Sequence, residues 1–406
     1  MKTAMRALVS GSILALAVSS SALAQDKTIK IGVLNDQSGL YADVTGPGSV
    51  LAAQMAVDDS GMAAKGWKIE VVSGDHQNKP DIGVNIARQW FDRDKVDVIV
   101  DVPTSSVGLA VNNVVKEKNG VYLNSGSGTS DLTNAQCSPN TVHWAYDTYM
   151  LANGTGSAMV KTGGDTWFFL TADYAFGTAL ERDTTNAVTA LGGKVVGSVR
   201  PPLNSADFSS FLLQAQSSKA KVIGLANAGG DTINSIKQAS EFGIVAGGQK
   251  LAGLLMFITD VHSLGLKTAA GLSFTEPFYW DLNDGTRGFS KRFQEKMKNK
   301  AMPTTVQAGV YSSLLHYFKT LDKMGGNSRD GIKIVEAMKA MPTDDIIFGK
   351  GSIQPNGRKI HPAYLLEVKK PEESKGPWDY MKVAATIPAE QAFTPLDKSS
   401  CPLLKK

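Results

Sequence analysis

Apolar positions along this chain fall into two alternating patterns: short continuous runs and longer stretches with helical spacing. A compact apolar run such as 29–34 predicts a strand, and the run 96–102, with apolar residues on both faces, predicts a strand buried in a parallel sheet. Apolar residues three and four positions apart, as in 49–57, predict a helix packed on that sheet. One block of this alternation ends near residue 123, and a second runs from about 151 to 257. The pattern predicts an α/β protein with two doubly wound parallel-sheet lobes.

The same patterns place the individual elements. Strands are predicted at 29–34, 67–72, 96–102, 121–123, 167–170, 195–199, 222–226 and 251–257. Helices are predicted at 49–57, 81–91, 107–118, 151–160, 178–191, 208–216 and 232–242. After residue 278 the pattern is helical, at 289–299, 306–324 and 332–341, before strands return in 346–368. No clean linker separates the blocks, which indicates that the chain crosses between the lobes more than once.

The first 24 residues have the composition of a secretory signal peptide. Lys2 and Arg6 precede an apolar stretch at 7–18, and Ala22-Leu23-Ala24 has the small-x-small pattern of a cleavage site. The alternative is a membrane anchor, but a span needs about 20 apolar residues and this stretch is shorter. We therefore expect an exported, soluble, periplasmic chain that begins near Gln25.

The net charge excludes one class of partner, and the chain length agrees with two lobes. The chain has 42 basic and 38 acidic residues, and loss of Lys2 and Arg6 leaves a formal charge of +2. A nearly neutral chain has no basic footprint for nucleic acid, so none is expected as a partner. A mature length of about 380 residues exceeds a single typical core, which agrees with two lobes.

The two cysteines, Cys137 and Cys401, are expected to form a disulfide. An even number of cysteines in an oxidising compartment usually pairs, although two unrelated buried thiols are the alternative. The bond would join the extreme C-terminus to the first third of the chain. We therefore interpret residues 386–406 as a strap linked to the N-terminal lobe.

Four loops predicted at the carboxyl ends of strands are rich in glycine and small hydroxyl residues. They lie at 35–41, 102–106, 124–131 and 227–231. Glycine lets backbone N–H groups approach a ligand, and hydroxyl groups add neutral donors, which together suit a carboxylate near a helix N-terminus. Ordinary helix capping explains any one of these loops, but four at the same edge of the sheets favour a ligand site.

Aromatic residues lie in or beside the strand-end loops. Rings in such positions can form the walls of a pocket and stack on an apolar or aromatic ligand. We interpret Tyr41, Tyr174 and Trp280 as ligand-facing, whereas Phe176 and Phe278 fit a ligand wall and core packing equally well.

No catalytic motif emerges from the sequence. There is no phosphate-binding loop, dinucleotide fingerprint or nucleophile elbow, and the five histidines have no metal-ligand spacing. We expect no enzyme activity, no metal and no cofactor.

A set of ordered motifs resembles the branched-chain amino acid binding family, the type I periplasmic solute receptors of ABC importers. The set comprises the first strand at 29–34, Ser38-Gly39, Pro103-Thr104-Ser105-Ser106, the segment 125–133, Asp173-Tyr174-Ala175-Phe176-Gly177 and Ile236-Lys237-Gln238-Ala239. It covers nearly the whole mature chain in order. The resemblance implies two lobes joined by a three-crossover hinge, with a ligand captured between them by hinge closure and delivered to an inner-membrane ABC permease.

The resemblance also implies roles for particular residues. In the first lobe, Thr104 or Ser105 would hold the ligand carboxylate together with Ser127, Gly128 and Thr129.

In the second lobe, Tyr174 or Phe176 would close on the ligand, together with Asn227 and Asp231. Amino acid binders of the family have an acidic group on the loop that corresponds to Met256, where this chain is apolar. Asp231 could meet an ammonium group instead, or the ligand could be an organic or aromatic acid without an amine.

The resemblance further predicts how the chain divides. We expect an N-terminal lobe of 25–146 plus 278–342, a C-terminal lobe of 147–277 plus 343–385, and a monomeric protein. Two other functions use similar scaffolds. A ligand-sensing regulator would need an N-terminal DNA-binding unit, and an exported α/β hydrolase would need a nucleophile motif; neither is present in the sequence.

Overall fold

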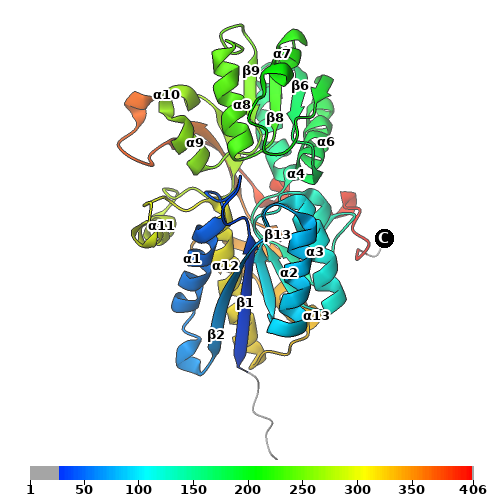
Figure 1. Ribbon diagram of the computed structural model, residues 1–406, viewed down its shortest axis with the longest axis vertical. Coiled ribbons are helices and arrows are strands. Elements are labelled where there is room, and N and C mark those ends of the chain that lie inside the picture. Colours follow the sequence, from blue (N-terminus) through cyan, green and yellow to red (C-terminus); the bar gives the residue numbers. More distant parts are fainter. Residues whose placement is uncertain (1–26, 405–406) are drawn as a thin grey trace, which may run out of the picture.

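The computed structural model of the chain describes residues 27–404, so the predicted signal peptide at 1–24 lies outside the described residues. Two lobes follow each other along the long axis of the molecule (Figure 1). Both are built on parallel sheets, which confirms the predicted α/β class with doubly wound lobes.

The first lobe has a five-stranded parallel sheet in the order β2-β1-β3-β4-β5. Its strands are β1 (Thr28–Asn35), β2 (Lys68–Asp75), β3 (Val98–Asp101), β4 (Val121–Asn124) and β5 (Thr141–His143). The helices are α1 (Gly46–Asp59), α2 (Pro80–Gln89), α3 (Ser105–Lys118), α11 (Asp284–Lys296), α12 (Thr305–Met324) and α13 (Gly331–Lys339). Helix α12 returns from far along the chain and packs against α1 and β3.

The second lobe has a four-stranded parallel sheet in the order β7-β6-β8-β9. Its strands are β6 (Thr166–Thr171), β7 (Lys194–Val199), β8 (Val222–Ala226) and β9 (Lys250–Gly253). The helices are α4 (Thr148–Leu151), α5 (Ser157–Lys161), α6 (Ala175–Ala190), α7 (Ser209–Ser217), α8 (Gly230–Glu241), α9 (Ile258–Leu264) and α10 (Leu266–Ala269).

Two small antiparallel sheets complete the fold. One has the order β10-β14-β15, with β10 (Ser273–Glu276), β14 (Ala363–Val368) and β15 (Met381–Ile387). The other has the order β11-β12-β13, with β11 (Thr343–Asp345), β12 (Gly349–Ile353) and β13 (Lys359–Ile360). A short helix, α14 (Ala389–Ala392), follows β15.

The chain passes between the lobes after β5, after β10 and after β13, and the segment after β15 returns to the first lobe. The exact lobe boundaries stay a prediction, but the contacts of 343–360 point to the first lobe. Strand β12 packs against α13, and Asp345 accepts a hydrogen bond of 3.0 Å from Ser312 of α12. We therefore group this segment with the first lobe, whereas β14 pairs with β10 in the second.

Two predicted elements differ from the observed ones. The predicted strand at 251–257 ends at Gly253, after which the chain leaves the sheet. The predicted helix at 151–160 is interrupted by a π-helical turn at Ala152–Gly156. In that turn a Cβ on Gly154 would lie 2.2 Å from Thr275 Oγ1 of β10, so the distorted backbone is in close contact with a strand.

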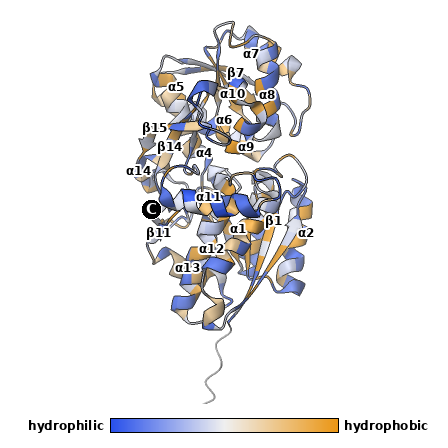
Figure 2. Cartoon of the chain, turned by 90° about the vertical axis from the view of Figure 1, so that its left-hand side faces the viewer, coloured by the Kyte–Doolittle hydropathy of each residue, from blue (hydrophilic) through white to orange (hydrophobic). Residues whose placement is uncertain are grey.

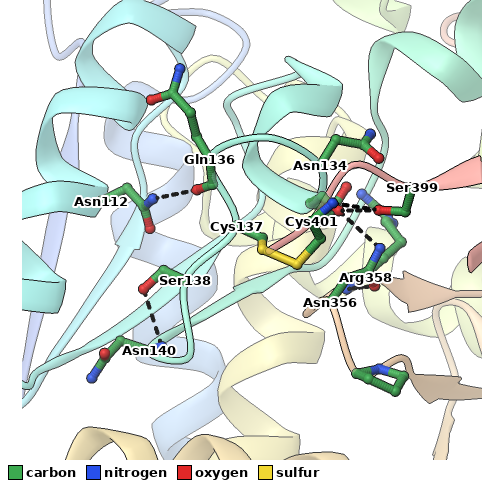
Figure 3. Close-up of a disulfide and its surroundings, with 12 residues drawn as sticks. Asn112, Asn134, Gln136, Cys137, Ser138, Asn140, Asn356, Arg358, Ser399 and Cys401 are labelled. Carbon is green, nitrogen blue, oxygen red and sulfur yellow. Dashed lines mark hydrogen bonds between the residues drawn. A yellow bond between two sulfur atoms is a disulfide. The ribbon is translucent and has the colours of Figure 1, made fainter. Parts of the chain in front are cut away.

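The cysteines Cys137 and Cys401 form a disulfide with a Cα–Cα distance of 5.6 Å (Figure 3). It joins the loop before β5 to the C-terminal segment, as predicted. Beside it, Ser399 donates a hydrogen bond of 3.2 Å to the Thr133 carbonyl. The tail is thus fastened to the first lobe at its far end.

The surface helices show the expected division of polarity. Helix α11 carries mostly hydrophilic residues (Figure 2) and buries Phe289 and Phe293 on its inner side. Within 27–404, none of the helices combines the length and apolar composition that a bilayer span requires. The same residues include no cluster of three metal-ligating side chains.

Candidate ligand-binding site

A small cavity lies between the carboxyl ends of the two parallel sheets. Its volume is about 20 Å³, close to the space that one water molecule needs. Residues from both lobes line it, and nearly all are aromatic or aliphatic. They are Tyr41, Val44, Pro103, Tyr146, Tyr174, Phe176, Ala228, Leu255, Phe257 and Val306. Since ligands of α/β sheets bind at these strand ends, the cavity is the candidate site.

Two tyrosines meet across the cavity. Tyr41 follows β1 in the first lobe and Tyr174 precedes α6 in the second, and their hydroxyl oxygens are 2.7 Å apart. Burial raises the pKa of both phenols, so both stay neutral hydrogen-bonding groups. On the first-lobe side, the Tyr146 hydroxyl donates a 2.7 Å bond to the Gly126 carbonyl. The three tyrosine rings therefore join the two lobes across the cavity, which is apolar with hydroxyl groups at its edge.

Glycines allow this close approach. A Cβ on Gly128 would lie 2.8 Å from the Phe176 ring and 2.9 Å from the Tyr146 ring. Gly229 has φ +56°, and a Cβ there would lie 3.1 Å from Tyr41. Both glycines lie in loops whose composition predicted a ligand site, and they bring backbone against aromatic rings of the cavity.

The predicted hydroxyl residues of the first lobe gather beside the cavity, although none is among its lining residues. Ser105 Oγ accepts a bond of 3.2 Å from the Thr129 N–H. Ser127 Oγ donates to the Val102 carbonyl, and Thr104 Oγ1 donates to Asn78 Oδ1.

All four predicted hydroxyl residues are fully buried. The Ser105 and Ser127 hydroxyl groups hold the two loops at 102–106 and 124–131 together, next to Pro103 of the cavity wall.

The backbone before Pro103 is strained. Asp101 has φ +80° and Val102 has φ +54°, conformations that are uncommon without glycine and rare for a β-branched residue. Asn35 Nδ2 donates a 2.9 Å bond to Asp101, whose pKa burial raises to about 6. Such strain often marks functional loops, and here it turns the chain from β3 toward the cavity.

The two polar residues predicted in the second lobe have different surroundings. Asn227 is engaged within its own lobe, by Ser235 at 3.0 Å and Thr232 at 2.7 Å. Asp231 is 2% exposed and accepts a 3.0 Å bond from the Asn204 N–H through Oδ2. Its other oxygen, Oδ1, is buried without a hydrogen-bond partner.

Burial raises the pKa of Asp231 to about 6. Its negative charge in turn contributes to the raised pKa of Tyr41 and Tyr174, so it lies within electrostatic reach of the tyrosine pair. Of the predicted site residues, Asp231 alone combines burial, charge and a free acceptor oxygen.

Two predicted site residues lie away from the cavity. Met256 is buried in the core of the second lobe, and its neighbours Leu255 and Phe257 line the cavity instead. Trp280 Nε1 donates a 2.8 Å bond to the Trp378 carbonyl, so its indole is engaged in tertiary packing. Phe278 also belongs to the core. Sequence reasoning missed Tyr146, because the three-residue strand β5 before it carries little signal.

Asp260 follows the cavity residue Phe257 and carries a testable pH dependence. Asp260 is 2% exposed, accepts a 2.9 Å bond from the Phe257 N–H, and has a pKa raised to about 7 by burial and by the charge of Asp43. The folded protein therefore holds a proton between about pH 4 and 7 that the unfolded chain releases. Stability from this group is thus lost as pH rises through that window.

We expect Asp260→Asn to match the parent protein near pH 4 and to become more stable than it toward pH 8. The amide oxygen still accepts from the Phe257 N–H, and the difference grows by at most about 1.4 kcal/mol per pH unit. Urea unfolding of both proteins from pH 4 to 8 measures the effect. A difference that stays constant with pH contradicts the assignment.

Comparisons with known proteins show relatives that match nearly the whole chain. A crystal structure of a periplasmic binding protein from Burkholderia mallei is 53% identical, with a TM-score of 0.90, covering 93% of this chain and 100% of that one. A branched chain amino acid ABC transporter periplasmic ligand-binding protein from Burkholderia xenovorans is 40% identical, with a TM-score of 0.82 and coverage of 92% and 99%. A Leu/Ile/Val-binding protein homolog from Brucella melitensis is 25% identical over 90% of this chain and 93% of its own length.

The sequence profile described as periplasmic binding protein matches residues 28–376. That span covers both lobes and every residue of the cavity wall. The family and these relatives are solute-binding proteins, not enzymes. The chain therefore belongs to the periplasmic binding protein family.

Proposed function

We propose that this protein is the periplasmic receptor of an ABC importer and that it captures a small aromatic carboxylate between its lobes. The observation that carries the proposal is the cavity itself, whose walls are aromatic rings and aliphatic side chains from both lobes. A flat apolar ligand body gains from stacking on rings and from burial on both sides. Its volume of about 20 Å³ means that the lobes must separate to admit such a ligand and then close around it.

The carboxylate would lie at the first-lobe edge of the cavity. Helix α3 begins at Ser105, two residues after Pro103 of the wall, and its N-terminal N–H groups favour an anion. The Thr104, Ser127 and Thr129 hydroxyl groups surround the same position and can exchange their internal bonds for bonds to a ligand.

The cavity offers little to an α-ammonium group. No lining residue carries a charge, and the Asp260 carboxylate is taken by the Phe257 N–H. An amine would have to reach Asp231 beyond the tyrosine pair. These features support an amine-free acid over a branched-chain amino acid.

The test is a thermal-shift and calorimetric screen of the purified chain, unfolded and refolded beforehand to remove co-purified ligand. The probes are benzoate, phenylacetate, leucine and phenylalanine. We expect benzoate or phenylacetate to raise the melting temperature and leucine to leave it unchanged. A shift with the amino acids alone would overturn the ligand class, and loss of that shift in Asp231→Asn would locate the ammonium.

A matched pair of glycine variants tests the cavity as the binding site. We expect Gly128→Ala to weaken ligand binding about 10- to 100-fold, because its Cβ meets the Phe176 and Tyr146 rings and such overpacking costs about 1–3 kcal/mol. Gly288→Ala is the control, since no atom lies within 4 Å of its new Cβ. Equal affinity of the two variants would show that the ligand binds elsewhere.

A further inference from the structure

We propose that Arg182 and Asp183 of α6 form a clasp between the lobes that positions the loop at 127–131 when the site is closed. This inference rests on the proposed function, because that loop borders the ligand cavity. Helix α6 belongs to the second lobe, where it packs against β6, β7 and β8, whereas the loop follows β4 of the first. The clasp therefore joins two bodies that hinge motion separates.

The contacts of the clasp form a connected network. Asp183 Oδ2 accepts bonds from Ser130 Oγ at 2.7 Å and from Thr148 Oγ1 at 2.6 Å. Arg182 donates to Ser130 Oγ at 2.8 Å and to Asp131 Oδ1 at 2.9 Å. Arg182 Nε also donates to Asp183 Oδ1 at 2.9 Å, which completes the link between the two charged residues of α6.

The backbone of the loop is held by the same group of residues. Ser130 N–H donates to Thr148 Oγ1 at 3.0 Å, and Thr148 N–H donates to the Gly128 carbonyl at 2.7 Å. Thr148 begins α4, directly after the chain leaves the first lobe. Thr148, the loop and α6 thus share one set of hydrogen bonds, and a change at Asp183 reaches Gly128 through Thr148 alone.

One helix face carries both the clasp and a wall of the cavity. Phe176 and Asp183 are seven positions apart on α6, two helical turns, so they lie on the same face. Phe176 lies against Gly128 and Asp183 binds Ser130, two residues further along the same loop. When the lobes close, the Phe176 ring and the Asp183 carboxylate therefore reach the loop at 127–131 at the same time.

Exposure separates the roles of the two charged residues. The Asp183 side chain is 9% exposed, whereas that of Arg182 is 44% exposed and its ion pairs are screened by water. Asp183 is accordingly the positioning residue, and Arg182 compensates its charge at the surface. A neighbouring ion pair on the same helix, Glu181 with Arg200 at 2.8 Å, lies within the second lobe.

That neighbour supplies the control. We expect Asp183→Asn to weaken benzoate-class ligand binding by about tenfold, mainly through faster dissociation, because charge-assisted bonds across a closed interface are lost. Glu181→Gln removes a carboxylate charge two residues earlier on α6, where the partner is Arg200 of the second lobe, and the affinity of this variant should match that of the parent protein. Equal affinity of Asp183→Asn and the parent would overturn the clasp and leave the proposed function standing.

A second measurement does not need a ligand. Lys79 and Asn204 line opposite sides of a groove at the cleft mouth, so spin labels at Lys79→Cys and the exposed Ala206→Cys report lobe separation. We expect Asp183→Asn to shift the label distances toward longer values and Glu181→Gln to leave them unchanged. If none of the probes binds the parent protein, the proposed ligand class is wrong. The change in label distance still tests whether Asp183 holds the lobes together. Unchanged distances in Asp183→Asn would overturn the clasp.

Discussion

Replacing Arg358 with methionine is expected to lower the free energy of unfolding by about 3–5 kcal/mol, because it leaves a buried charge without its partner. Arg358 and Asp147 are each 1% exposed, and Arg358 Nη1 lies 3.6 Å from Asp147 Oδ2. Burial lowers the pKa of Arg358 to about 10 and raises that of Asp147 to about 6, so both are charged at neutral pH. The pair lies where the chain first leaves the N-terminal lobe.

The guanidinium group also binds the hinge backbone. It donates to the carbonyls of Trp144 at 3.1 Å, Ala145 at 2.6 Å and Tyr146 at 3.3 Å. Methionine keeps much of the volume of the side chain and removes every one of these bonds. Three carbonyls would then compete for the remaining donors, among which His361 already contacts Ala145 at 2.8 Å.

Chemical denaturation of three variants separates these contributions. Arg287→Met is the surface control, since Arg287 is 45% exposed and water screens its pairs with Asp281 and Asp284, so little stability should be lost. Arg358→Met combined with Asp147→Asn should recover part of the loss, because the amide still accepts from the Met150 N–H that Asp147 caps. A loss below about 1 kcal/mol in Arg358→Met would show that the pair is unimportant for stability.

The hinge cluster, formed by Arg358, Asp147 and the backbone of 144–146, also shows which contacts could not be predicted from the sequence. Apolar runs identified every strand of the two parallel sheets except β5, and the runs are most continuous where a strand is covered on two faces, as in β3 and β8. Strand β5, at Thr141–His143, is too short and too polar to carry that signal. Without β5, nothing in the sequence placed Tyr146 at the cavity or Arg358 beside it, since their contacts join residues more than 200 positions apart.

The sequence predicted those parts of the candidate site whose position follows from a general rule about parallel strands. Strand-end loops rich in glycine and hydroxyl groups lie together because parallel strands end at one edge, and this holds for Ser127 and Gly128. Side-chain direction beyond a strand end has no such rule. The chain leaves β9 at Gly253, and the irregular segment that follows turns Leu255 and Phe257 to the cavity and Met256 to the core.

The C-terminal strap gives the second large effect. Converting both Cys137 and Cys401 to serine is expected to lower the free energy of unfolding by about 3–5 kcal/mol, because the disulfide closes a loop between residues 264 positions apart. Phe393 lies within the strap, is 2% exposed and has its ring centroid 4.1 Å from the Arg358 guanidinium. Freeing the strap therefore also exposes the hinge cluster to water.

That contact makes the two large effects dependent on each other. If release of the strap uncovers Arg358, the double serine variant already loses part of what Arg358→Met removes, and the combined variant should lose less than the sum of the two. A reductant should destabilise the parent protein by the same amount and leave the double serine variant unchanged. Strict additivity would mean that Phe393 stays on Arg358 without the disulfide, held by contacts such as the 2.6 Å bond from Asn153 to the Gln391 carbonyl.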